Sequence, residues 1–309
     1  MAKKAPAIST ATSTDSPIDN SATNFSRALH GIENGNQDEV STSISTEIKD
    51  ILHKFELSEN LFLILYDEVD SISSFHSDRL YSAATKAGIN KDILLLLHSG
   101  GGGIEPAYLV SKTLKRVAKK FSTVVPRRAK SAATLIALGS DEVHMGLMSE
   151  LGPIDPQMGG LPALALGNAL NVIAELVCKF PDAAPLLGKY ISDQVPVRVL
   201  GYYERVNESA VQYAERLLNG KELGNIGNAT ETANHLVNHF KDHSFVIDIE
   251  ESKNILGPMV CERTKEYDAA NEIFEFLDLI RFICSKNGYD FWMVGTADNF
   301  EWRRKKSKE

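Results

Sequence analysis

The chain contains few cysteines and no long apolar run. Its three cysteines, Cys178, Cys261 and Cys284, are far apart and form neither a CxxC pair nor a zinc-finger pattern with histidines. This usage suits a reducing cytosol. No segment reaches the roughly 18 to 20 apolar residues of a membrane-spanning helix, so we expect no membrane span. Lys3 and Lys4 are followed by Ser, Thr and Asp rather than by an apolar stretch, which predicts a cytoplasmic protein without a secretory signal.

A positive net charge is also lacking. The chain has 33 Lys and Arg against 41 Asp and Glu, for a formal net charge of −8. A diffuse cationic surface that could neutralise a phosphate backbone is therefore excluded, and nucleic acid is not an expected partner. A short basic stretch ends the chain, and we interpret it as a solvated tail: Arg303, Arg304, Lys305, Lys306 and Lys308.

What the chain does contain is enough apolar material for a large core, with 43% hydrophobic residues in 309. Short apolar runs at 61–66 and 93–97, and further strand patterns at 122–125 and around Val143, alternate with helical patterns. Continuous apolar strands are typical of a parallel sheet that is covered by helices on both faces. The sequence therefore predicts an α/β fold.

Three segments follow from composition and periodicity. Residues 1–45 are rich in Ser, Thr, Asn and Asp, and we expect a disordered arm there. Residues 46–225 carry the α/β alternation and form the predicted core. Residues 226–309 are predicted to form an α+β extension with a short strand at 245–249, a long amphipathic helix at 267–284 and the basic tail. The sequence leaves open whether this extension is a separate domain.

A glycine-rich bend is the first feature that points to chemistry. In LLLLHSGGGGIEPAYLVSKTL, a buried strand ends in Gly100–Gly103 and a helix begins at once. Glycines let backbone amides turn toward a bound oxygen, and the helix N-terminus adds positive potential. Nucleotide sites share this outline, but the run lacks GxxxxGK[ST], and Lys119 and Lys120 stand where a dinucleotide site needs an acid. An anion pocket is the prediction.

The second feature is a serine that opens a helix of small residues. In VVPRRAKSAATLIALGSDEV, Ser131 lies at the expected helix start, where a developing oxyanion is stabilised by the helix dipole. Ala132 and Ala133 leave room for a substrate backbone. The plainer alternative is that Ser131 only caps the helix, as serine often does. Lys130 precedes it and is expected to point into solvent.

The segments LLHSGGGG, AKSAATLIALGSDEV and SELGPIDPQ, in that order, resemble the ClpP/crotonase superfamily, and within it the serine dehydrogenase proteinases. The resemblance implies a parallel-sheet spiral core with added C-terminal helices and a serine peptidase without cofactor or metal. Ser131 would be the nucleophile, with Gly101, Gly102 and Ala132 as the oxyanion hole. It also implies a peptide or protein substrate and a homo-oligomer, with the helical region after Gly159 as an interface.

The general base is not identified by the resemblance. ClpP has a histidine in the segment that corresponds to GPIDPQ, whereas this chain has Ile154 and Asp155 there. Asp155 could orient a base or act as a weak one, although an ordinary carboxylate is poorly matched to a hydroxyl. His243, in KDHSFVID, is a candidate base. Lys179 and Lys189 are further candidates, by analogy with the Ser–Lys dyads of signal peptide peptidases.

Two other functions remain open. A crotonase-like acyl-CoA enzyme would use the same amides to stabilise a thioester enolate, which leaves the Ser131 segment without a special role. A non-catalytic assembly or peptide-binding protein would have kept the fold and lost the base, and the missing histidine favours it. His98 ends the strand before the bend, and we interpret it as an anchor for the loop.

Overall fold

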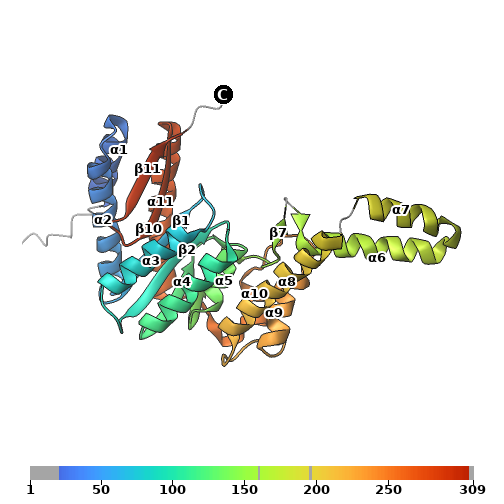
Figure 1. Ribbon diagram of the computed structural model, residues 1–309. Coiled ribbons are helices and arrows are strands. Elements are labelled where there is room, and N and C mark those ends of the chain that lie inside the picture. Colours follow the sequence, from blue (N-terminus) through green and yellow to red (C-terminus); the bar gives the residue numbers. More distant parts are fainter. Residues whose placement is uncertain (1–20, 159–160, 195–196, 306–309) are drawn as a thin grey trace, which may run out of the picture.

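A computed structural model describes residues 21–158, 161–194 and 197–305 of the chain (Figure 1). Its α-helices are α1 (Ser21–Asn34), α2 (Gln37–Lys54), α3 (Ser74–Lys86), α4 (Ile104–Val117), α5 (Ala132–Leu138), α6 (Ala163–Lys179), α7 (Ala184–Gln194), α8 (Val197–Leu218), α9 (Ala229–Asn238), α10 (Ile249–Leu256) and α11 (Lys265–Lys286). Two 3-10 turns are η1 (Pro181–Ala183) and η2 (Gly257–Met259). The strands are β1 (Leu61–Asp67), β2 (Asp92–Ser99), β3 (Lys120–Val125), β4 (Arg128–Ala129), β5 (Glu142–Met145), β6 (Glu150–Leu151), β7 (Gln157–Met158), β8 (Leu161–Pro162), β9 (Val260–Glu262), β10 (Tyr289–Gly295) and β11 (Phe300–Arg304).

The main sheet is largely parallel and confirms the predicted α/β class. Its strands run in the order β11-β10-β1-β2-β3-β5-β9, and β4 pairs with β2 and with β6. Within this sheet the neighbours β1-β2-β3-β5-β9 pair in parallel, and so does β4 with β2 and β6. β10 pairs antiparallel with both β1 and β11. The strand patterns expected near 61–66, 93–97 and 122–125 correspond to β1, β2 and β3.

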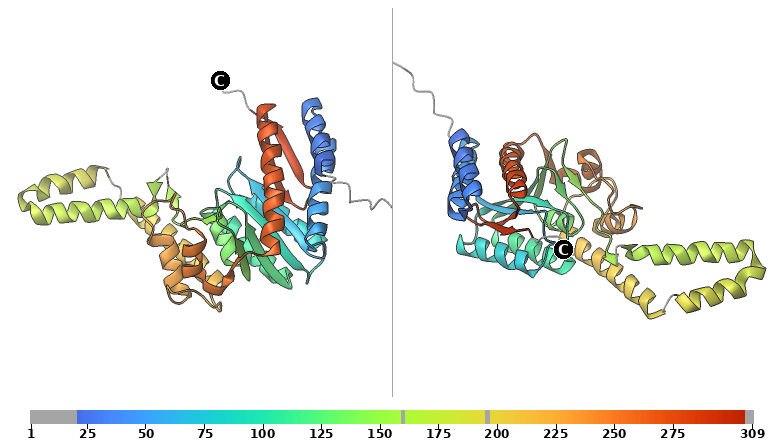
Figure 2. Two further views of the ribbon diagram at one scale, coloured as in Figure 1. Left: turned by 180° about the vertical axis from the view of Figure 1, so that it is seen from behind. Right: turned by 90° about the horizontal axis from the view of Figure 1, so that it is seen from above.

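Helices cover both faces of the sheet, as Figures 1 and 2 show. Along β1, Leu63 and Leu65 pack into one core cluster, with residues of α3, α4, α5 and α8. Ile64 and Tyr66 point to the opposite face and pack with α1, α2 and α11. Alternate side chains of a strand point to opposite faces, which explains why this strand is apolar along its whole length.

The N-terminal segment differs from its prediction. Residues 1–20 and 306–309 lie outside the described residues, but α1 and α2 occupy most of 21–45, where we expected a disordered arm. Val40, Ile44, Ile48 and Ile51 of α2 are buried against the sheet and α11. Their spacing of three to four residues forms an apolar stripe within a polar composition.

The C-terminal segment is built into the main sheet. β9 extends one edge beside β5, and β10 and β11 extend the other beyond β1. The predicted strand at 245–249 is reduced to an isolated bridge between Leu151 and Ile247. Arg303 and Arg304, expected in a solvated tail, lie in β11, and Arg303 pairs with Asp70 at 3.1 Å.

One helical arm extends away from the sheet. α6, η1 and α7 form a hairpin that projects from the body beside α8 (Figures 1 and 2). Among the described residues, no helix is both long and apolar enough to cross a lipid bilayer.

Candidate active site

A cavity opens where the parallel strands β1 and β2 reach their carboxyl ends, the usual place for a binding site in such sheets. Its volume is about 500 Å³. Segments that are distant in the sequence line it together: Gly100, Gly101, Gly102, Ser131, Ala132, Ile154, Pro156, Gln157 and His243. The structure therefore brings the predicted glycine bend and the predicted serine to one site.

The glycine bend and Ser131 are in direct proximity. The backbone N–H of Lys130 donates to the carbonyl oxygen of Ser99 at 3.1 Å, which holds the turn before Ser131 against the end of β2. Gly101 has a φ of +104°, and a Cβ atom built there would lie 2.7 Å from the Cβ of Ser131. Only glycine allows the bend to approach the serine this closely.

The backbone of Ser131 is unusual. Its φ is 51° and its ψ is −120°, a conformation that costs a non-glycine residue about 1–3 kcal/mol. Ser131 stands at the N-cap position of α5, yet its side chain makes no capping hydrogen bond. The capping interpretation therefore does not account for this serine. A hydroxyl on a sharp strand-to-helix turn is also how nucleophilic serines are presented in other hydrolase folds.

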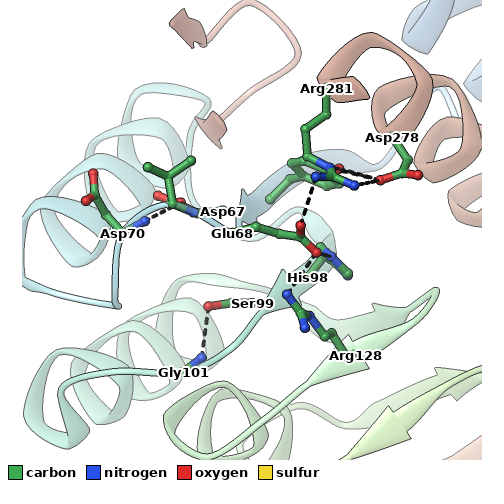
Figure 3. A network of polar contacts seen from close by, with 11 residues as sticks. Asp67, Glu68, Asp70, His98, Ser99, Gly101, Arg128, Asp278 and Arg281 are labelled. Carbon is green, nitrogen blue, oxygen red and sulfur yellow. Dashed lines mark hydrogen bonds and ion pairs between the residues drawn. The ribbon is translucent and has the colours of Figure 1, made fainter. Parts of the chain in front are cut away.

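The three predicted oxyanion donors are not equivalent. The N–H of Gly101 donates to the Ser99 hydroxyl at 3.2 Å, so this amide is already engaged within the bend (Figure 3). The carbonyl of Gly101 and the N–H of Gly103 both pair with the backbone of Ile72. The amide of Gly102, between them, points the opposite way from Ile72 because successive groups of an extended segment alternate. Gly102 and Ala132 thus fit the role better than Gly101 does.

His243 lines the same cavity as Ser131 and is paired with a carboxylate. His243 Nδ1 lies 2.7 Å from Asp155 Oδ1, across 88 residues of sequence. The Asp155 side chain is 8% exposed and that of His243 is 29% exposed. Gln157 Nε2 donates to the other carboxylate oxygen at 2.7 Å. Because Nδ1 is turned toward Asp155, Nε2 is the ring nitrogen of His243 that remains for proton transfer at this cavity.

Backbone pairing holds the two loops together. Leu151 and Ile247 exchange hydrogen bonds of 2.9 and 3.1 Å, just before Asp155 and just after His243. Lys130 Nζ donates to the carbonyl of Phe245 at 3.0 Å and forms an ion pair with a carboxylate of β6 at 3.0 Å. The side chain of Lys130 is only 14% exposed, so the expectation of a solvated lysine is wrong.

The lysine alternatives lie elsewhere. Lys179 ends α6 and Lys189 belongs to α7, so both are on the projecting arm, and both side chains are exposed. Neither residue lines the cavity. The Ser–Lys arrangement considered from the sequence therefore has no geometric support within the described chain.

A network of polar contacts around the half-buried Glu68 lies at the edge of the cavity (Figure 3). The carboxylate of Glu68, which follows β1, accepts hydrogen bonds from His98 Nε2 at 2.7 Å and from Arg128 at 2.9 Å, and it forms an ion pair with Arg281 at 3.2 Å. The hydrogen bond from His98, with help from the two arginines, lowers the pKa of Glu68 to about 2. His98 is 2% exposed, and burial lowers its own pKa.

We expected His98 to anchor the glycine bend, whereas its hydrogen bond goes to Glu68 in the loop after β1. Glu68 was missed by the sequence analysis because it is one acid in a polar loop, and its partners come from β2, β4 and α11. Gln157 was missed too, although it stands in the SELGPIDPQ segment that carries the resemblance.

Comparison with known proteins gives a family match. Residues 38–177 match the family described as ClpP-like SDH-type serine proteinase. Two curated relatives from Methanocaldococcus jannaschii are similar over part of the chain. Uncharacterized protein MJ0137 is 33% identical over 133 residues, or 43% of this chain and 46% of that protein. Uncharacterized protein MJ1495 is 28% identical over 131 residues, or 42% of this chain and 44% of that protein. The match spans less than half the length of either relative.

Two solved structures of a membrane-bound protease are also similar. The 1510-N membrane-bound stomatin-specific protease, as a serine-to-alanine mutant, is 15% identical and has a TM-score of 0.39, covering 67% of this chain and 79% of that one. A lysine-to-alanine mutant of it, in complex with a substrate peptide, is 15% identical with a TM-score of 0.38, covering 63% and 72%.

Proposed function

We propose that the chain is a serine peptidase of the ClpP-like SDH type, the family that residues 38–177 match, with Ser131 as its nucleophile. One observation carries this proposal: Ser131, uncapped and held in a strained backbone, shares a cavity with His243, whose ring is paired with Asp155 at 2.7 Å. These are the three groups that a serine nucleophile needs, namely a hydroxyl, a base and an orienting carboxylate.

The proposed mechanism uses each group once. Asp155 accepts from Nδ1–H of His243 and fixes the tautomer, so Nε2 can take the proton of the Ser131 hydroxyl. The Ser131 oxygen attacks the peptide carbonyl, and the amides of Gly102 and Ala132 stabilise the resulting oxyanion. His243 then gives its proton to the leaving amine. A water molecule, activated by His243 in turn, hydrolyses the acyl-enzyme and releases Ser131.

The substrate, the absence of a cofactor, the cellular compartment and the assembly of the chain are also proposals. We expect a peptide or protein substrate that is cut internally, as in ClpP-class peptidases, and no cofactor. The free thiols of Cys178, Cys261 and Cys284 suit a reducing cytoplasm. Assembly with further copies of the chain is expected through the helical arm that follows residue 159, because this arm exposes apolar side chains.

The two alternative functions, an acyl-CoA enzyme and a non-catalytic protein, account for fewer features of the site. An acyl-CoA enzyme would need the oxyanion amides but has no use for the strained Ser131 or for the His243–Asp155 pair. A non-catalytic protein was favoured by the absence of a histidine at the ClpP position. His243 supplies an imidazole from another part of the chain, which removes the main reason for that view.

A fluorophosphonate probe tests the proposal, because it reacts with an activated serine. We expect the full chain to be labelled, the Ser131→Ala variant to lose labelling, and peptide hydrolysis to fall by about a thousandfold or more. Ser209→Ala, at an exposed serine of α8, is the control and should label normally. Equal labelling of a folded Ser131→Ala variant would defeat the proposal. Thermal stabilisation by coenzyme A thioesters without labelling would favour the acyl-CoA alternative.

A further inference from the structure

Three side chains with metal-binding atoms meet on neighbouring strands outside the cavity. They are Glu142 and His144 of β5 and Cys261 of β9. Their ligand atoms, one carboxylate oxygen, one imidazole nitrogen and the thiol sulfur, all lie within 4.8 Å of one another. None of the three lines the cavity around Ser131. The peptidase proposal gives them no role.

The parallel pairing of β5 and β9 sets this geometry. His144 and Cys261 are register partners, so their side chains lie side by side. Glu142 precedes His144 by two residues and therefore points to the same face of the sheet. Val143, between them, points to the other face and is buried in the core. Glu142 and Cys261 are half-buried, which leaves an approach from solvent.

His144 contributes the independent observation. Its side chain is 3% exposed, and its Nδ1 lies 2.9 Å from the hydroxyl of Thr264, the N-cap residue of α11. Its buried Nε2 lies 3.3 Å from Glu142 Oε2 in an ion-pair contact, but no atom is aligned to complete a regular hydrogen bond with it. A buried imidazole nitrogen without a regular hydrogen bond is uncommon, and a cation shared with the Glu142 carboxylate would satisfy both groups. An imidazole fixed through one nitrogen with the other one free is how histidine ligands of metals are held.

The two carboxylate oxygens of Glu142 have different neighbours. Lys120 Nζ lies 2.7 Å from Oε1. The other oxygen, Oε2, is the one beside His144. The lysine therefore neutralises part of the charge of Glu142.

We propose that Glu142, His144 and Cys261 bind one zinc ion. Thiolate, imidazole and carboxylate are the ligand types of zinc, whereas magnesium and calcium prefer oxygen ligands alone. Zinc bonds of about 2.0–2.3 Å separate tetrahedral ligand atoms by roughly 3.3–3.8 Å, so small side-chain rotations close the site. A water molecule would complete the tetrahedron. The ion would tie β9 to β5, and so fasten the C-terminal segment to the core.

The test uses the full chain, stripped with a chelator and titrated with zinc and with cobalt. We expect one zinc per chain and a cobalt spectrum with a thiolate charge-transfer band in the near ultraviolet. Cys261→Ser should abolish that band. It should also weaken zinc binding by at least about tenfold, as should His144→Ala, since even residues that only support a metal ligand cost 10–100-fold. Cys261→Ser is nearly isosteric at a half-buried position, so it keeps the test valid if His144→Ala fails to fold.

Two control variants separate this site from others. Cys178→Ser removes an exposed thiol on α6, and His239→Ala breaks the stacked pair His235–His239, whose rings are 4.2 Å apart and could bind zinc adventitiously. Both controls should keep the wild-type affinity and the thiolate band. Absence of zinc binding, a cobalt spectrum without thiolate, or loss of binding only in the His239→Ala variant would each overturn the proposal. All of these readouts are independent of peptidase activity, so they do not depend on the role of Ser131.

Discussion

At the scale of single residues, the sequence supplied the members of the site but not their pairing. Ser131, His243 and Asp155 were all candidates: His243 as a base, and Asp155 as a group that could orient a base or act as a weak one. The structure joins these two at 2.7 Å. Their approach depends on the backbone bridge between Leu151 and Ile247, a contact between distant segments that no local pattern encodes.

Replacing Asp155 tests whether the pair works as an orienting unit. In Asp155→Asn the side chain keeps its size, but an amide nitrogen can face Nδ1 and favour the wrong tautomer of His243. We expect kcat for peptide hydrolysis to fall by about 10³–10⁴-fold with little change in KM. Fluorophosphonate labelling of Ser131 should slow in parallel.

Gln157→Ala is the matched control, since it removes the hydrogen bonds from Gln157 Nε2 to the second carboxylate oxygen of Asp155 at 2.7 Å and to its carbonyl at 3.5 Å, but keeps the Asp155 carboxylate. Its effect on kcat should be much smaller than that of Asp155→Asn. Wild-type turnover by a folded Asp155→Asn variant would mean that Asp155 does not orient the base.

At the scale of helices and strands, the pattern of apolar residues predicted the elements correctly, whereas the average composition of a segment did not. The apolar runs of β1 and β2 identified a buried parallel sheet, because strands covered on both faces are apolar throughout. The Ser/Thr-rich N-terminal segment hid α2, whose stripe of Val40, Ile44 and Ile48 is diluted by polar neighbours. The strand β11 was hidden because its basic residues looked like a tail.

Glu68 is the junction of several elements, and its protonation should affect stability. It links the end of β1 to His98 of β2, Arg128 of β4 and Arg281 of α11. The pKa of this carboxyl is lowered to about 2, first by the hydrogen bond from His98. A depressed pKa means that the folded state favours the charged form, so its stabilisation is complete above the unfolded pKa of about 4.3 and is lost as pH falls toward 2.

The Glu68→Gln variant should therefore be destabilised in a pH-dependent way. Because Glu68 is only half-buried, solvent screening reduces the effect, and we expect a loss of about 1–2 kcal/mol in the free energy of unfolding at pH 7. Urea denaturation at pH 7, 5 and 3 should show that the difference in unfolding free energy between the wild type and the variant becomes smaller below pH 5. Glu59→Gln, at an exposed glutamate, should show no such trend. A difference in unfolding free energy that stays constant between pH 7 and 3 would contradict the stabilising role of the charged Glu68 carboxylate.

At the scale of the whole molecule, the helical arm is the feature that a single copy of the chain leaves without cover. α6 and α7 project from the body (Figure 2), and large apolar side chains on or beside them are exposed: Val172 (56%), Leu176 (39%), Phe180 (62%), Leu186 (72%) and Tyr190 (60%). A large exposed apolar surface of this kind marks an interaction site. The family resemblance makes a second copy of the chain the expected occupant.

Charged substitutions on the arm test this assembly. We expect the wild-type chain to run as a multiple of its 34.0 kDa protomer in light scattering, and Phe180→Asp with Leu186→Asp to shift it toward the protomer mass. Both side chains are mostly exposed in one copy, so circular dichroism and the unfolding midpoint should change little. Lys189→Ala, an exposed and non-apolar position on α7, should leave the mass unchanged. A monomeric wild type, or a double variant with the wild-type mass, would remove the arm as an interface, because desolvation of these apolar side chains is the only driving force assigned to it.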